Sequence, residues 1–237
     1  MLLYYYVELL MKSPVAFVVF AGAFACSLLT ALILHEVAHG LVALLRGDRT
    51  ALVLGRLTLN PRAHWDPVGT TMMFILGFGW AKPVPVNPYN LSSPVRDMAL
   101  VALAGPSMNF FIAILAGLPI RLGLVPLVHP FTSPGYMSLG WENLVGLFLG
   151  TVMLLNIIIG VFNLVPIPPL DGSKIVPLFL PKALRSGYEK FSSYGMFILI
   201  LLIILPYFTE FPGIGSVIGP VISTLVPFFS GANAVVF

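Results

Sequence analysis

Four long stretches without a charged residue constrain the fold of this chain more than any other feature. They are Val15–Leu34, Met98–Ile120, Asn143–Leu170 and Phe191–Thr209, with 20, 23, 28 and 19 residues. A helix needs about 20 mainly apolar residues to cross a bilayer. Only 9% of the chain is charged, whereas soluble domains carry about 25%, so this chain cannot cover a soluble surface. We predict an all-α multi-pass membrane protein with four transmembrane helices, the first of which continues to about Leu45.

Two further uncharged runs leave the number of spans open between four and six. Val68–Ala81 is too short to span a bilayer as a helix and is interpreted as re-entrant or interfacial. Phe211–Phe237 is interrupted by glycines and prolines, and is interpreted either as an irregular fifth span or as a tail on the membrane surface.

The segment between the first two spans, residues 46–97, has a different pattern. TALVLGRLTLNP at 50–61 alternates around a glycine, which predicts a small membrane-associated β-hairpin. KPVPVN at 82–87 is too rich in proline for a helix or a central strand, so it is predicted to be extended, at an edge. We therefore expect a β-hairpin or extended segment in the first cytoplasmic loop.

Basic residues alternate between the loops and predict the orientation. One side carries ten lysines and arginines, in two loops: Arg46, Arg49, Arg56, Arg62, Lys82 and Arg96, then Lys174, Lys182, Arg185 and Lys190. The other side carries only Lys12 and Arg121. The positive-inside rule places the basic loops in the cytoplasm and the amino terminus outside the cell membrane. The net charge of +3 is therefore interpreted as a topology signal, and no nucleic-acid partner is expected.

The first span contains HEVAH at 35–39, an unusual set of polar residues for a membrane helix. His35 and His39 are four residues apart and so lie on one face, where two imidazoles can share a metal ion, and Glu36 can reach a water bound to that ion. This H-E-x-x-H pattern is typical of zinc metalloproteases. The alternative is two interior histidines with a paired glutamate. Ionisable groups inside a membrane are costly and usually functional, which favours the metal site.

A catalytic zinc site needs a third protein ligand. Asp171, in NLVPIPPLDG at 163–172, is a candidate because the prolines before it should unwind the third span and let the chain fold back. A plain turn at Asp171 is the alternative. His64 lies in a polar turn and is interpreted as a loop residue, and His129 lies on the opposite side. The single cysteine, Cys26, excludes a multi-cysteine zinc site.

HEVAH and NLVPIPPLDG together resemble the site-2 protease family of intramembrane zinc metalloproteases, the M50 peptidases. The resemblance extends, in the family's order, to three more stretches: NPRAHWDPVGT at 60–70, GWAKPVPVNP at 79–88 and AGPSMN at 104–109. It implies Zn²⁺ bound by His35, His39 and Asp171, with Glu36 as the catalytic base. It also implies that Asn163 contacts substrate near the metal; a helix cap or an inter-helix hydrogen bond is the alternative for Asn163.

We therefore expect a single membrane metalloprotease domain over residues 1–237, with its catalytic core at about 15–175 and C-terminal spans at about 191–237. The chain resembles a minimal member, without a PDZ or CBS domain. Its expected partners are the lipid bilayer and the transmembrane helices of membrane-protein substrates. The oligomeric state stays open.

The predicted reaction is cleavage of single-span membrane proteins or remnant signal peptides close to the cytoplasmic face. Val84 and Val86 are expected to pair with the unwound substrate as an added strand. Asn109 is expected to bridge helices beside small residues. The alternative function is a non-proteolytic zinc-binding membrane protein that acts as a scaffold or metal carrier.

Overall fold

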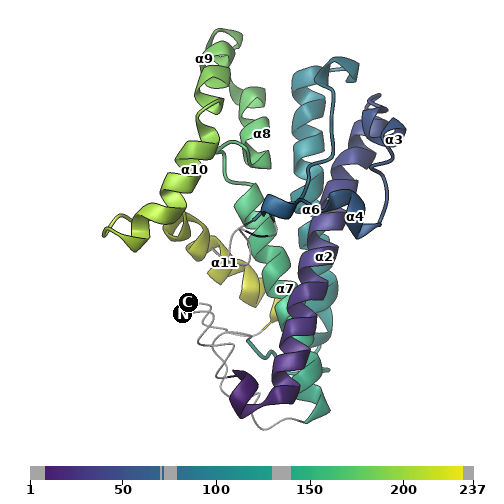
Figure 1. Cartoon of the computed structure of the whole chain (residues 1–237), viewed down its shortest axis with the longest axis vertical. Helices are drawn as coiled ribbons and strands as arrows, with labels where there is room; N and C mark the ends of the chain where they lie inside the picture. The colour runs from purple at the N-terminus through teal and green to yellow at the C-terminus, as the bar shows by residue number, and fades with distance from the viewer. Residues whose placement is uncertain (1–8, 70, 72–78, 130–139, 232–237) are drawn as a thin grey trace. The chain divides into compact units, whose positions relative to one another are not determined.

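The computed structural model describes residues 9–69, 71, 79–129 and 140–231, and everything regular in them is helical (Figure 1). The elements, in chain order, are α2 (Pro14–Leu45), α3 (Thr50–Val53), α4 (Pro61–His64), η1 (Pro88–Asn90), α6 (Pro94–Arg121), α7 (Trp141–Asn163), α8 (Asp171–Phe179), α9 (Lys182–Ser192), α10 (Gly195–Ile204), η3 (Leu205–Tyr207) and α11 (Ile214–Ser230).

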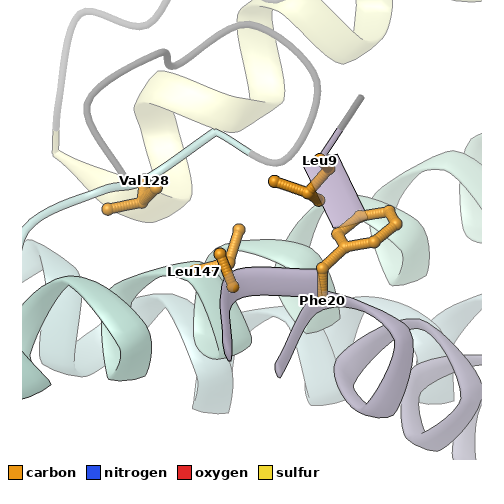
Figure 2. Close-up of a cluster of buried hydrophobic side chains, with 5 residues drawn as sticks. Leu9, Phe20, Val128 and Leu147 are labelled. Atoms are coloured by element: carbon orange, nitrogen blue, oxygen red, sulfur yellow. The ribbon is translucent and has the colours of Figure 1, made fainter. Parts of the chain in front are cut away.

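The chain divides into two compact units that share the long helices. The first unit comprises residues 1–31, 110–159 and 216–237. Its core includes a cluster of Leu9, Ala16, Phe20, Val128 and Leu147, all buried, which Figure 2 shows. A polar contact lies in the same unit, where buried Asn156 of α7 donates to Ser27 of α2 over 3.3 Å. This contact gives α2 and α7 a hydrogen bond between helices of the kind expected in membrane bundles.

The second unit comprises residues 32–109 and 160–215. It contains the carboxyl-terminal part of α2, the amino-terminal part of α6 and the last residues of α7. It also contains the short helices α3, α4, η1, α8, α9, α10 and η3. HEVAH, KPVPVN and Asp171 all lie in this unit, so it is the unit that builds the candidate site.

Among the residues that the structure describes, three helices are long and apolar enough to cross a membrane: α2, α6 and α7. They match the first three predicted spans, and α2 runs through the histidines to Leu45 as expected. In the described part of the chain, a fourth span results if α9 and α10, which meet at a bend of 58°, are counted as one. The predicted helix at 191–209 is divided because α10 begins at Gly195 and gives way to η3 before Pro206. At 214–230, α11 has 17 residues.

The predicted β-hairpin at 50–61 is wrong: no strand occurs in the described residues. The Asp48 carboxylate accepts a hydrogen bond over 3.0 Å from the N–H of Thr50, the first residue of α3. Such a local side-chain bond to the backbone competes with strand pairing. Gly55, with φ of 65°, lies just after this turn. Asn60 then caps α4 by accepting from the Arg62 N–H. The short apolar run at 68–81 lies largely outside the described residues.

The segment after α7 folds as the prolines predicted. α7 ends at Asn163, and turns occupy residues 164–170 before α8 begins at Asp171. Gly172 permits this return, since a Cβ there would lie 2.1 Å from the Leu164 carbonyl oxygen. Gly195 has a similar role at the start of α10, because its Cβ would lie 2.4 Å from the Cβ of Pro168. Two glycines therefore let α8 and α10 pack directly against the proline turn that carries Asp171.

Candidate metal centre

His35 and His39 stand one turn apart on α2, and both are buried. Their rings meet edge to face, with centroids 4.5 Å apart and an interplanar angle of 88°. The two Nε2 atoms are 2.9 Å apart. The i, i+4 spacing therefore brings the two imidazole nitrogens to one point, as the sequence predicted.

Asp171, the first residue of α8, brings a carboxylate to the same point. Its Oδ2 lies 3.0 Å from the Nε2 of His35 and 3.0 Å from the Nε2 of His39. Its other oxygen, Oδ1, accepts from Lys174 Nζ one helical turn later, over 3.0 Å. Asp171 thus presents one oxygen to the histidines and keeps the other paired. Among the described residues, these three side chains form the one group of histidine, cysteine and acidic residues able to hold a metal ion.

The opposite nitrogens of both rings are held by α6. His35 Nδ1 lies 2.7 Å from Asn109 Oδ1, and His39 Nδ1 lies 2.6 Å from the Val101 carbonyl oxygen. A carbonyl oxygen only accepts, so His39 must carry its proton on Nδ1. The same assignment on His35 pairs its Nδ1–H with the Asn109 oxygen. In the neutral rings, both Nε2 atoms then bear lone pairs.

Three acceptors therefore converge within 3.0 Å: the two Nε2 lone pairs and the Asp171 Oδ2. Such a group is repulsive unless a cation or protons lie between its members. Two imidazoles whose far nitrogens donate to protein oxygens, plus a carboxylate, form the donor set that catalytic zinc takes from proteins.

A small space beside these donors is kept open by Gly105 on α6. A Cβ at this position would lie 2.5 Å from His39 Nε2 and 2.6 Å from His35 Nε2. Zinc binds imidazole nitrogen at about 2.0–2.1 Å, so a side chain at Gly105 would occupy nearly the place that an ion needs. The residues present therefore fit a zinc ion in both donor chemistry and space.

Glu36 lies beside this cluster on α2 and is half-buried. Its Oε2 accepts from the backbone N–H of Val84 over 2.6 Å. Val84 belongs to KPVPVN, whose side chain at this position is buried. The segment that sequence reasoning assigned to substrate therefore also holds the predicted catalytic base.

The remaining predicted residues lie as follows. Val86 is partly buried two residues beyond Val84, and Asn163 is the last residue of α7. His64 is not in a loop as predicted: it is the buried last residue of α4, and its Nε2 lies 2.8 Å from the Thr58 carbonyl oxygen. His129 belongs to the other unit and is not in the cluster.

Sequence reasoning missed three contributors to the site. Asn109 was assigned to helix bridging in general; it does join α6 to α2, but through His35. Its position four residues after Gly105, on the same face of α6, could have indicated this. Lys174, three residues after Asp171, offers a similar signal. Val101 acts through its backbone carbonyl, which no side-chain pattern reveals.

Comparisons with known proteins identify the family. The profile of Peptidase family M50 matches residues 127–206, which include Asp171. "Putative zinc metalloprotease YwhC" of Bacillus subtilis is 36% identical over 180 residues, covering 76% of this chain and 79% of the relative. The chain belongs to peptidase family M50. "Putative zinc metalloprotease Rip2" of Mycobacterium tuberculosis is 30% identical over 196 residues, covering 79% of this chain and 70% of that relative. No solved structure matches the chain significantly.

The family assignment confirms the resemblance drawn from HEVAH and NLVPIPPLDG. With the three apolar helices, it makes this M50 peptidase a multi-pass membrane zinc metalloprotease.

Proposed function

We propose that this M50 peptidase cleaves single-span membrane proteins or remnant signal peptides within the membrane, near its cytoplasmic face. His35, His39 and Asp171 are the proposed zinc ligands, and Glu36 is the proposed general base. The observation that carries the proposal is the convergence of two Nε2 atoms and one carboxylate oxygen within 3.0 Å, directly beside Glu36 in the sequence.

The chain's own residues supply positioning and proton transfer. A zinc ion, when bound, supplies Lewis-acid activation of water and of the scissile carbonyl. Glu36 takes the proton from the attacking water and passes it to the leaving nitrogen. Val84 holds one Glu36 oxygen by its N–H, so the carboxylate has a fixed direction and the other oxygen remains for the proton. Asn109 and the Val101 carbonyl fix the two imidazoles.

Depth and charge support the proposed cytoplasmic location. His35 lies ten residues before the end of α2 at Leu45, about 15 Å at 1.5 Å per residue. Ten basic residues lie in the two loops on this side of the spans, against two on the other, and the positive-inside rule assigns such loops to the cytoplasm. Water would then reach the site from the cytoplasm, and the amino terminus would lie outside.

The KPVPVN segment is the proposed substrate contact, but through one residue instead of the two, Val84 and Val86, that the sequence suggested. Four of its residues have an N–H, and three of these donate within the protein: Lys82 to the His64 carbonyl oxygen, Val84 to Glu36, and Asn87 to Asp48. In this described segment, the Val86 N–H is the one without a hydrogen bond. We propose that Val86 donates to the unwound substrate, while Val84 acts on Glu36.

The function is tested with purified protein in liposomes and a panel of synthetic single-span helices. The wild type is compared with Glu36→Gln, and Glu142→Gln serves as the matched control because Glu142 is exposed at the start of α7. Cleavage is located by mass spectrometry of the products.

We expect cuts by the wild type and by Glu142→Gln near the cytoplasmic ends of the helices, and none by Glu36→Gln with zinc still bound. Undiminished cleavage by Glu36→Gln would remove its role as base. Zinc binding without cleavage by any variant, across the whole panel, would favour the scaffold or metal-carrier alternative.

A further inference from the structure

Asp48, three residues beyond the end of α2, is a fully buried carboxylate outside the candidate metal centre. Its Oδ1 accepts from the Thr50 N–H and hydroxyl and from Asn90 Nδ2, the last over 2.8 Å. Its Oδ2 accepts from the Asn87 backbone N–H over 2.7 Å. A buried charge is tolerated only when it is paired or fully hydrogen-bonded, and here four donors from two separate stretches of chain provide the bonds.

The Asn87 N–H is the important donor, because Asn87 ends the KPVPVN segment. The other carboxylate that binds this segment is Glu36, through the Val84 N–H. Asp48 and Glu36 are twelve residues apart on one stretch of chain. The two carboxylates therefore hold the segment at two points. Val84 donates its backbone N–H to Glu36, and Asn87, three positions later, donates its backbone N–H to Asp48.

Three further contacts keep the segment in place. The Lys82 N–H donates to the His64 carbonyl oxygen over 2.9 Å, and Arg56 donates to the Lys82 carbonyl oxygen over 2.8 Å. The Val84 side chain packs at Gly40 of α2, because a Cβ added at Gly40 would lie only 3.1 Å from the Val84 Cγ1. Asp48 is the anchor at the carboxyl-terminal end, beyond Val86.

We infer that Asp48 is a positioning residue that holds KPVPVN so that the Val84 N–H orients Glu36. The inference rests on the proposed role of Glu36 as the base. Asp48 touches neither the three proposed zinc ligands nor Glu36 in any described contact, so it acts only through the segment.

Asp48→Asn tests this with little change in shape. The amide oxygen of Asn takes the Oδ1 place, where three donors meet, and the amide NH₂ then faces the Asn87 N–H. Two donors then face each other, so the substitution removes the hydrogen bond from the Asn87 N–H and keeps those at the Oδ1 position. Asp97→Asn is the matched control: Asp97 is also buried and accepts from Arg46 and from the Ser93 N–H, but binds no residue of KPVPVN.

The direct readout is amide hydrogen exchange in the full-length, zinc-loaded protein, resolved to single residues in KPVPVN. In the wild type, we expect Val84 and Asn87 to be protected and Val86 to exchange fast. In Asp48→Asn, exchange at Val84 and Asn87 should rise at least tenfold, whereas Asp97→Asn should leave both unchanged. Asn90→Ala removes one exposed donor to Asp48 and should give a smaller rise in exchange at Val84 and Asn87. If Asp48→Asn fails to fold, the exchange measured in Asn90→Ala tests the inference in its place.

Zinc content and kinetics complete the test. Asp48→Asn should keep its zinc, and per zinc-loaded chain its kcat on the best-cleaved helix of the panel should fall about tenfold with a smaller change in KM. Unchanged exchange in Asp48→Asn, or an equal rise in Asp97→Asn, would overturn the inference. If the wild type cleaves no helix while the expected exchange pattern is found, Asp48 still positions KPVPVN and it is the proposed function that fails.

Discussion

Gly105→Ala should weaken zinc binding by more than about 100-fold while leaving the fold intact. The added Cβ would lie 2.5 Å from His39 Nε2 and 2.6 Å from His35 Nε2, against 3.4–4 Å for an ordinary contact. Relief would require each ring to retreat by about 1 Å, but both are held on the other side by short bonds from Nδ1. The methyl group would also occupy nearly the place of an ion bound at about 2.1 Å.

The effect on stability is much smaller because two contributions oppose each other. Alanine is better than glycine in a helix interior by about 1 kcal/mol, and overpacking costs about 1–3 kcal/mol. We therefore expect a net loss of no more than about 2 kcal/mol. Loss of a hydrogen bond that supports a metal ligand lowers metal affinity about 10–100-fold. Displacement of the ligands themselves is more damaging, so we expect the zinc affinity of Gly105→Ala to fall by more than about 100-fold.

Affinity is measured in detergent by competition with a chromophoric chelator, and stability by the thermal unfolding of the apo protein. Gly22→Ala is the control, since a Cβ at Gly22 of α2 meets nothing within 4 Å. It should bind zinc like the wild type. Wild-type affinity in Gly105→Ala would refute the assignment of this space to the ion.

Three further predictions concern the contacts around the site. Asn109→Ala should weaken zinc binding about 10–100-fold in the chelator competition, because His35 loses the bond that orients its ring. Burial raises the pKa of Asp48, but hydrogen bonds from Thr50, Asn90 and Asn87 outweigh this effect and leave the pKa below its usual range. The stability that Asp48 contributes is therefore present above its ordinary pKa and is lost as the pH falls. Asp48→Asn should accordingly flatten the acid side of a plot of unfolding temperature against pH. Val84→Pro should lower kcat by removing the donor to Glu36, whereas Val86→Pro should raise KM with zinc retained in both; equal effects on kcat and KM would contradict the separate roles.

The membrane helices and the grouping of His35, His39 and Asp171 were predictable because each depends on a strong local pattern. Long uncharged runs indicate spans whatever their neighbours are, and they predicted α2, α6 and α7. The i, i+4 spacing of His35 and His39 implies one helix face. Asp171 was a candidate because few other residues could serve and the prolines before it end α7. These inferences use composition and geometry within one element.

The β-hairpin failed because its prediction used alternation alone. Residues 50–61 alternate like a strand, but Asp48 and Asn60 each accept from the backbone N–H two residues on, at the first turns of α3 and α4. Such local bonds depend on which way a side chain turns, and a short pattern does not reveal that. The fourth predicted span, 191–209, is not one continuous helix for a related reason, since a count of uncharged residues does not register the break before Gly195.

The contacts that tune the site could not be predicted because they join distant segments. Val84 reaches Glu36 across 48 residues, and Asn109 reaches His35 across 74. The Val101 carbonyl and the space at Gly105 are backbone features of α6. The spacing of Gly105 and Asn109 indicates a shared face of α6, but none of these pairings follows from residue type at a position, because each requires the segments to be placed against one another first.

The most direct test of the account is the zinc content of three purified proteins after dialysis against a weak chelator: the wild type, Asp171→Asn and Asp97→Asn. Both substitutions replace a buried carboxylate by its amide, but only Asp171 faces the two histidines. We expect about one zinc per chain in the wild type and in Asp97→Asn, and almost none in Asp171→Asn. Full zinc in Asp171→Asn would contradict the proposal that His35, His39 and Asp171 hold the metal.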